Sequence, residues 1–231
     1  MRIDILPDAA AVARHAASFI AAAARIAAGA HGRFTLAVSG GHTPWEMLRA
    51  LATDDVPWAQ MHVLQVDERV APAGDPDRNL THLRESLLAH APLPSWQLHP
   101  MPVEEADLVG AAARYAAMLH ELAGSPPVLD LIHLGLGPDG HTASLVPGDA
   151  VLGVNDVDVA LTSGTYQNRR RMTLTYPVLN RARQVLWVVT GAEKADALCK
   201  LRAADASIPA GCVEQARAIV LADRDAAAGL S

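Results

Sequence analysis

The chain has 231 residues, of which 51% are hydrophobic and 19% charged, enough to bury a sizeable apolar interior. Nineteen basic against twenty-five acidic residues give a net charge of −6, which argues against a general nucleic-acid binder. Asp4 and Asp8 stand where an export signal needs an apolar run, and Cys199 and Cys212 make no disulfide framework. We therefore expect a cytoplasmic protein with no membrane span and no nucleic-acid partner.

Helical and strand patterns alternate along nearly the whole chain. Apolar residues with helical spacing predict helices over residues 8–28, 45–51, 79–88, 104–122 and 193–203. Short apolar runs predict strands over residues 34–38, 61–66, 129–134, 157–161, 172–175, 185–189 and 218–221. No linker or internal repeat divides the chain, so we predict a single domain of residues 1–231. The predicted class is α/β, with a mainly parallel sheet covered by helices on both faces.

The turn after the strand predicted at 34–38 has the sequence SGGHTP. In parallel sheets, ligands bind outside the carboxyl ends of the strands. Gly40 and Gly41 let a ligand approach the backbone, the next helix offers free N–H groups, and Thr43 adds a hydroxyl. The turn therefore suits phosphate or another anion, although a tight turn without a ligand explains it equally well. The spacings of a Walker loop and of a dinucleotide fingerprint are missing.

A charged cluster follows the strand predicted at 61–66. Asp67, Glu68 and Arg69 are difficult to bury unless they have partners. They either bind polar groups of a substrate or form a structural ion-pair network. Taken alone, the cluster favours the structural interpretation.

A glycine-rich loop follows the strand predicted at 129–134. It has the sequence GLGPDGHTAS and carries Asp139 and His141 two residues apart. Because an imidazole titrates near neutral pH, His141 is a candidate general base toward water. Asp-x-His supplies at most two metal ligands, so we expect no metal. His62 and His133 lie within predicted strands and are expected to be satisfied core groups.

Basic residues flank two later strands. The run Arg169–Arg171 precedes the strand at 172–175, and such a triplet in isolation is typical of a solvated face. Lys194, one of only two lysines in the chain, follows the strand at 185–189. Together with the glycine turn, its ammonium would complete an anion pocket.

Taken together, these segments resemble the 6-phosphogluconolactonase family. In the family's order, the matching segments are SGGHTP, VDERVAP with DPDRN, LGLGPDGHTASLVPG, RMTLTYPVLNRA, VTGAEK and AIVLADRDAA. They span most of residues 35–228, and their joint occurrence is far more specific than any one of them. The resemblance implies a modified Rossmann-like fold shared with glucosamine-6-phosphate deaminases, ribose-5-phosphate isomerases and CoA transferases. It also implies hydrolysis of 6-phospho-D-glucono-1,5-lactone to 6-phosphogluconate, in the oxidative pentose phosphate pathway, without a cofactor.

The resemblance also implies roles for individual residues. His141 is the expected base that activates water, and Asp139 and Asp67 are expected to orient the sugar hydroxyls or the histidine. Arg69 is expected to bind substrate or the developing negative charge. The residues expected to hold the 6-phosphate are Gly40, Gly41, Thr43, Arg171 and Lys194. Among the arginine triplet, Arg171 is preferred because it abuts the strand.

Two positions depart from the family pattern, and two other functions stay open. His42 stands where a serine or arginine is expected, and Arg78 stands where serine often precedes the asparagine. One alternative is a glucosamine-6-phosphate deaminase, but residues 142–148 lack the glutamate that follows the histidine in that family. The other is a non-catalytic sugar-phosphate binder. The only partner that we expect is the small-molecule substrate, 6-phosphogluconolactone. We expect the chain to be a monomer or a weak homo-oligomer.

Overall fold

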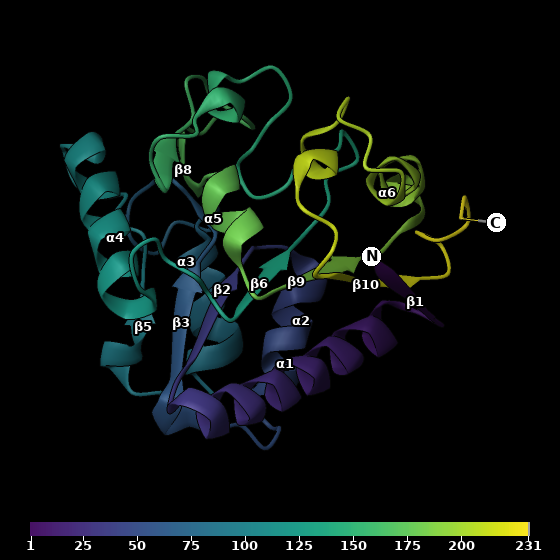
Figure 1. Ribbon diagram of the computed structural model, residues 1–231, viewed down its shortest axis with the longest axis horizontal. Helices are drawn as coiled ribbons and strands as arrows, with labels where there is room; N and C mark the ends of the chain where they lie inside the picture. The colour runs from purple at the N-terminus through teal and green to yellow at the C-terminus, as the bar shows by residue number, and fades with distance from the viewer. Residues whose placement is uncertain (231) are drawn as a thin grey trace.

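The computed structural model describes residues 1–230 and has a parallel sheet at its centre (Figure 1). Every pairing in this seven-stranded sheet is parallel. In sheet order the strands are β1 (Arg2–Leu6), β10 (Ala218–Asp223), β9 (Gln184–Val189), β6 (Leu131–Leu134), β2 (Phe34–Val38), β3 (Met61–Gln65) and β5 (Leu98–His99). The prediction of an α/β fold with a mainly parallel sheet is therefore confirmed.

Helices cover both faces of this sheet, as predicted. One hydrophobic core packs under α1 (Ala9–His31), α2 (His42–Leu51) and α3 (Asn79–Leu83). The other core packs under α4 (Leu108–Ala123), α5 (Tyr176–Arg181) and α6 (Ala195–Arg202). Strands between two such layers are buried on both sides, which explains why β2 and β6 consist of buried residues throughout. Among the described helices, none has the length and apolarity that crossing a membrane requires.

A second, three-stranded sheet lies beyond the carboxyl end of β3. It contains β4 (Asp67–Arg69), β8 (Arg171–Leu174) and β7 (Val159–Leu161), paired antiparallel in that order. The strands predicted at 157–161 and 172–175 therefore exist, but they belong to this small sheet and not to the parallel one. Backbone bonding explains the position, because Leu174 N–H donates to Val66 O at 2.8 Å, directly after β3.

Several predicted boundaries shift because local capping decides where a helix begins. Asp8 caps α1 by accepting from Ala11 N–H at 2.7 Å. The helix predicted from residue 104 begins only at Leu108, because Asp107 accepts from Gly110 N–H at 2.9 Å. The helix predicted at 79–88 is α-helical only to Leu83 and continues as a π-helical turn over 84–88. Strands β1, β4 and β5 and helix α5 were not predicted from the sequence.

The order of the sheet places a crevice at its centre. Strand β2 pairs with β3 on one side and with β6 on the other, so the chain reverses the direction in which it adds strands. Loops that leave the carboxyl ends of β2 and β6 therefore diverge to opposite faces. The SGGHTP turn and the GLGPDGH loop are these two loops.

Candidate active site

A cavity of about 340 Å³ opens at this crevice. Its walls come from the loops after β2, β6 and β9 and from strands β4 and β8. Of the predicted site residues, those that line it are Gly40, Gly41, Thr43, Asp67, Arg69, His141, Arg171 and Lys194. Asp139, the remaining predicted residue, lies against His141. Tertiary structure thus brings together groups that are up to about 150 residues apart in the sequence.

The first wall is the start of α2, which presents backbone N–H groups. Gly41 is the N-cap at φ 134° and has no side chain to cap the helix, so the first N–H groups are left for a ligand. Gly40 is required by a close approach, because a Cβ there would meet Asn79 Oδ1 at 2.0 Å. The Thr43 hydroxyl lies 2.8 Å from that of Thr190, which joins α2 to the end of β9.

Lys194 reaches the same cavity from the segment after β9. It ends a 3₁₀ turn over 192–194, and its ammonium lies 3.9 Å from the Glu193 carboxylate. Its side chain is about one-fifth exposed. Combined with a helix N-terminus, this cation makes the α2 side of the cavity suitable for an anion.

His141 projects from the loop after β6 with one ring nitrogen engaged. Its Nδ1 lies 2.6 Å from Asp139 Oδ1, a contact in which Nδ1–H donates to the carboxylate. This arrangement leaves the Nε2 lone pair available to a proton. Gly137 permits the close packing, because a Cβ there would meet His141 Nδ1 at 2.0 Å.

The carboxylate of Asp139 is held in its ionised form. Burial alone would raise the pKa of Asp139, but hydrogen bonds from His141 and Tyr166 outweigh burial and the pKa lies below its ordinary value. The Tyr166 hydroxyl donates to Asp139 Oδ2 at 3.1 Å. Each oxygen of this carboxylate therefore has its own donor.

Two arginines form the opposite wall. The register of β4 and β8 sets Arg69 directly opposite Arg171. Like charges at paired strand positions are unfavourable unless an anion offsets them. Burial lowers the pKa of Arg171; Asp67 counteracts this effect and Arg69 adds to it. Among residues 1–230, the buried Nε of each arginine has no hydrogen-bond partner.

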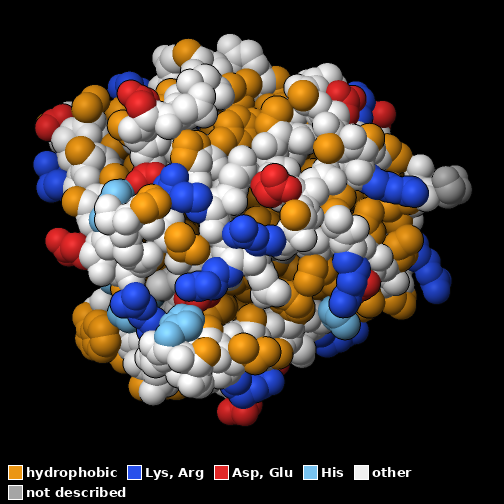
Figure 2. Space-filling model, in the orientation of Figure 1, with side chains coloured by type: hydrophobic (Ala, Val, Ile, Leu, Met, Phe, Trp, Pro, Cys, Tyr) orange, Lys and Arg blue, Asp and Glu red, His pale blue; other side chains and the backbone are white. Residues whose placement is uncertain are grey.

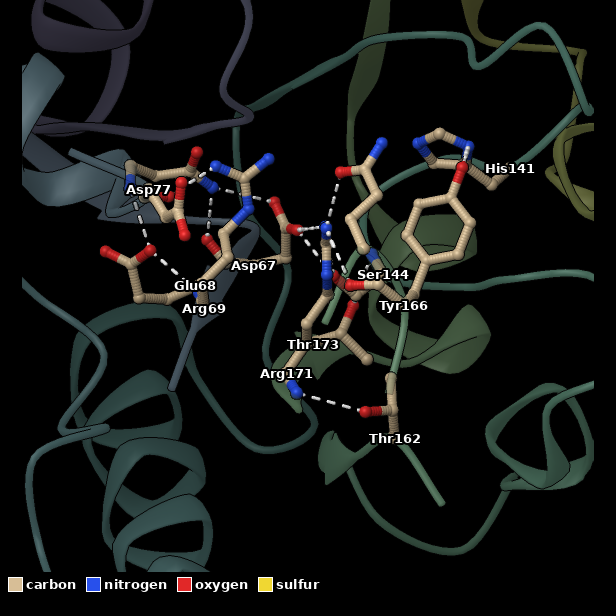
Figure 3. Close-up of polar contacts among 12 residues, drawn as sticks. Asp67, Glu68, Arg69, Asp77, His141, Ser144, Thr162, Tyr166, Arg171 and Thr173 are labelled. Atoms are coloured by element: carbon tan, nitrogen blue, oxygen red, sulfur yellow. Dashed lines mark hydrogen bonds and ion pairs between the residues drawn. The ribbon is translucent and has the colours of Figure 1, made fainter. Parts of the chain in front are cut away.

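Asp67 holds this wall together and does not orient the histidine. Its Oδ2 accepts from Ser144 Oγ at 2.6 Å, its Oδ1 accepts from Asn79 Nδ2 at 3.2 Å, and Arg171 lies 3.9 Å away. Figure 3 shows Asp67 and His141 on opposite sides of Arg171. Asp67 and Asp139 were expected to orient either the sugar hydroxyls or the histidine. Of these two carboxylates, Asp139 is the one that contacts the histidine.

Glu68 has a structural role. This agrees with the structural interpretation that the charged cluster Asp67, Glu68 and Arg69 favoured when its sequence was considered alone. It is fully buried and accepts from the N–H groups of Asn79 and Leu80, each at 2.8 Å, at the start of α3. Arg78, one of the departures from the family pattern, is also buried and lies 3.1 Å from Glu68. This unusual residue is thus part of the support beneath the cavity.

Only one arginine of the triplet points into the cavity. Arg169 pairs with Asp75 at 3.0 Å and with Asp77 at 2.9 Å, outside the cavity lining. Arg170 donates to Thr162 O at 3.3 Å. Arg171 is almost fully buried and lines the cavity, so its position agrees with the preference for it in the sequence.

Other residues of the site had no assigned role in the sequence. Ser144 lies within the glycine-loop motif, so the motif already contained a signal for it. Tyr166 and Gln167 lie in a hairpin whose sequence gave no such signal. Gln167 and Asn168 adopt left-handed conformations, with φ of 52° and 62°, and Gln167 Oε1 accepts from Arg171 at 2.9 Å. Non-glycine residues in this region of φ, ψ space mark a constrained turn.

The remaining histidines and acidic residues do not converge. Within residues 1–230, no three His, Cys, Asp or Glu side chains are placed to hold a metal ion. His133 is fully buried and accepts from Ser39 N–H at 3.3 Å, although its Nε2 has no partner in the described chain. Burial lowers the pKa of His133 to about 3, so this residue is a neutral core group.

Residues 7–221 match the protein family described as glucosamine-6-phosphate isomerases/6-phosphogluconolactonase. This chain belongs to that family. A curated member, the 6-phosphogluconolactonase of Mycobacterium tuberculosis, is 37% identical over 241 residues, which cover 99% of this chain and 98% of the relative. The resemblance noted in the sequence is therefore confirmed.

Solved structures of family members have the same fold. The 6-phosphogluconolactonase of Thermotoga maritima is 27% identical, with a TM-score of 0.85 over 96% of this chain and 98% of that protein. A monomeric glucosamine-6-phosphate deaminase is 18% identical, with a TM-score of 0.84 over 99% and 100% of the two chains. The fold is thus shared with the deaminases, as the resemblance implied.

Proposed function

We propose that this family member hydrolyses 6-phospho-D-glucono-1,5-lactone to 6-phospho-D-gluconate in the oxidative pentose phosphate pathway. The observation that carries the proposal is the pairing of two features across one cavity. One side holds a histidine whose Nδ1 is engaged by Asp139 at 2.6 Å, and the other holds an uncapped helix start with Lys194. A lactone phosphate needs a base at its carbonyl end and donors at its phosphate end.

In the proposed reaction, His141 Nε2 takes a proton from water while the water oxygen bonds to C1 of the lactone. The carbonyl oxygen becomes an oxyanion, and Arg69 faces this developing charge. As the tetrahedral intermediate collapses, the C1–O5 bond breaks, the imidazolium returns its proton to O5, and the new carboxylic acid ionises to 6-phosphogluconate and a free proton. Asp139 keeps the proton on Nδ1 and stabilises the imidazolium between these two steps.

At the other end of the substrate, the proposed phosphate site combines backbone and side-chain donors. Its residues are Gly40, Gly41, Thr43, Arg171 and Lys194, all of which line the cavity. Binding energy from the phosphate holds the lactone carbonyl near His141, so a group remote from the reaction increases its rate. Neither end requires a cofactor or a metal in this proposal.

The test is direct measurement of lactone hydrolysis. The lactone is generated in situ by enzymatic oxidation of glucose 6-phosphate, and proton release is compared with the spontaneous rate. Acceleration that depends on protein concentration is the expected result, and a rate equal to the background would reject the proposal. Ammonia release from glucosamine 6-phosphate is the parallel control, and ammonia without lactone hydrolysis would point to the deaminase.

The domain organisation, the oligomeric state and the cellular location of the protein stay predictions. We propose that residues 1–231 act as one domain, which the pairing of β1 with β10 near the two ends of the chain supports. Cys199 and Cys212 are both free thiols. Basic and acidic side chains are interspersed over the face in Figure 2, where a nucleic-acid binder would present a basic stripe. Sedimentation tests whether the protein is a monomer or a weak homo-oligomer, as predicted. Cell fractionation tests the predicted cytoplasmic location.

A further inference from the structure

Tyr166 contacts the proposed base, its carboxylate partner and a buried cation at once. Its hydroxyl lies 3.1 Å from Asp139 Oδ2 and 3.3 Å from His141 Nδ1. Its ring packs edge-on against the imidazole, with centroids 5.0 Å apart, and the guanidinium of Arg171 lies 5.0 Å from the same ring. Figure 3 shows Tyr166 between His141 and Arg171.

The hairpin that carries Tyr166 is fixed at both ends. Tyr166 N–H donates to Arg169 O at 3.0 Å across the turn. Arg169 is bound in turn by Asp75 and Asp77 from the segment before α3, at 3.0 and 2.9 Å. A side chain anchored in this way holds its hydroxyl at a defined position and loses little further entropy when the substrate binds.

The hydroxyl acts as a donor. Burial and the adjacent Asp139 raise the pKa of Tyr166, so the phenol keeps its proton. Asp139 has no proton to donate when ionised, so the Tyr166 hydrogen points to Oδ2 while Nδ1–H occupies Oδ1. With both oxygens occupied, the carboxylate plane cannot rotate away from the histidine.

We propose that Tyr166 is a positioning residue that fixes the Asp139 carboxylate and limits how strongly this carboxylate holds the His141 proton. This inference rests on the proposed function of His141 as the base. A carboxylate that accepts a second hydrogen bond is a weaker acceptor for the first. Loss of the hydroxyl therefore has two consequences: the imidazole is held less precisely, and the imidazolium is stabilised more.

Tyr166→Phe separates these effects from packing, because phenylalanine keeps the ring beside His141 and Arg171. We expect kcat to fall about 5- to 10-fold, which corresponds to one hydrogen bond of about 1 kcal/mol, with KM within about twofold. The low-pH limb of kcat/KM should move upward by about half a pH unit. The charged and titratable groups that line the cavity besides His141 are unchanged in this variant: His42, Asp67, Arg69, Arg171, Glu193 and Lys194.

A double-mutant cycle tests whether Tyr166 acts through Asp139. In an Asp139→Asn background, Tyr166→Phe should reduce kcat by less than about twofold further, since the carboxylate is gone. Tyr176→Phe is the matched control, because the Tyr176 hydroxyl donates to Pro209 O at 2.9 Å outside the cavity lining. Wild-type kcat in Tyr166→Phe, or an undiminished effect on the Asp139→Asn background, would overturn the inference.

Imidazole ¹⁵N resonances give a readout that needs no turnover. His141 signals are assigned by their loss in His141→Asn, and their titration is compared between wild type, Tyr166→Phe and Tyr176→Phe. We expect the midpoint to rise only in Tyr166→Phe, and identical titrations in all three proteins would reject the inference. If the wild type lacks lactonase activity while the midpoint still rises, the proposed function fails but the contact among Tyr166, Asp139 and His141 stands.

Discussion

The seven-stranded sheet reaches the cavity through the loops that follow its strands, whereas the three-stranded sheet reaches it through residues of its own strands. The parallel sheet contributes glycine backbone, the histidine and the lysine from the segments after β2, β6 and β9. The small sheet contributes Asp67 and Arg69 from β4 and Arg171 from β8, all held by strand pairing.

The two sheets therefore differ in what their cavity residues contribute. Those from the parallel sheet act mainly on the substrate in our proposal, whereas those from the small sheet also hold the structure together. Loop residues at the ends of parallel strands can be exchanged without breaking the sheet, and the side chains of His141 and Lys194 are each about one-fifth exposed. Asp67 and Arg171 are almost fully buried and take part in the hydrogen bonding of the small sheet. Substitutions in the two regions should therefore fail in different ways, and the following experiments test that expectation.

The largest effect is expected from His141→Asn in the loop after β6. Loss of the proposed general base should reduce kcat for the lactone about 100-fold or more, with KM little changed, because the proposed phosphate site is intact. Steady-state kinetics of lactone hydrolysis measure it. His120→Asn is the matched control, since His120 also pairs with an aspartate, Asp158 at 2.6 Å, but outside the cavity lining. Full activity of His141→Asn would remove this residue as the base.

Arg171→Met should reduce both binding and stability. The substitution removes a proposed phosphate donor and leaves buried Asp67 without its nearby cation, so we expect KM to rise about 30-fold and the free energy of unfolding to fall by about 2 to 3 kcal/mol. Urea unfolding and substrate kinetics measure the two effects on the same preparation. A variant with wild-type stability would contradict the structural role that we assign to the small sheet.

Lys194→Met tests the parallel-sheet side of the same phosphate site. We expect KM to rise about 10-fold, with kcat and the free energy of unfolding close to wild type, because Lys194 lines the cavity and its ion pair with Glu193 is long, at 3.9 Å. Comparison with Arg171→Met then separates an effect on substrate binding from an effect on the free energy of unfolding. A loss of stability equal to that of Arg171→Met would show that the two regions do not differ.

His133 gives a smaller effect that depends on pH. The folded protein holds this imidazole neutral with a pKa of about 3, whereas the pKa of a histidine in the unfolded chain is about 6.5. Between these values the unfolded chain binds the extra proton, so stability is lost as the pH falls below about 6.5. Between pH 7.5 and 5.5 we expect a loss of about 1 kcal/mol from this group. Urea unfolding of His133→Asn over this range should show a correspondingly flatter dependence on pH.

Sequence patterns predicted most of the parallel sheet and the residues after its strands. Runs such as Phe34–Val38 are buried throughout and apolar except for Thr35 because both faces are covered, and this makes them recognisable. The glycine turn and the Asp139–His141 loop were found because parallel strands place their functional groups at the carboxyl end. The sequence predicted strands close to β7 and β8 but not their separate antiparallel sheet, and it missed β4, whose three charged residues form no apolar pattern.

The sequence alone determined the α/β class, the family and the segments that carry the charged groups, because these depend on residue type and local spacing. Only the tertiary structure decided how those groups meet. Pairing of β4 with β8 sets Arg69 opposite Arg171 across about 100 residues of chain. The tertiary structure also distinguished Asp139, which contacts His141, from Asp67, which does not, and it placed Tyr166 against both Asp139 and His141. Contacts between distant segments depend on strand register and on the path of the chain, and local patterns encode neither.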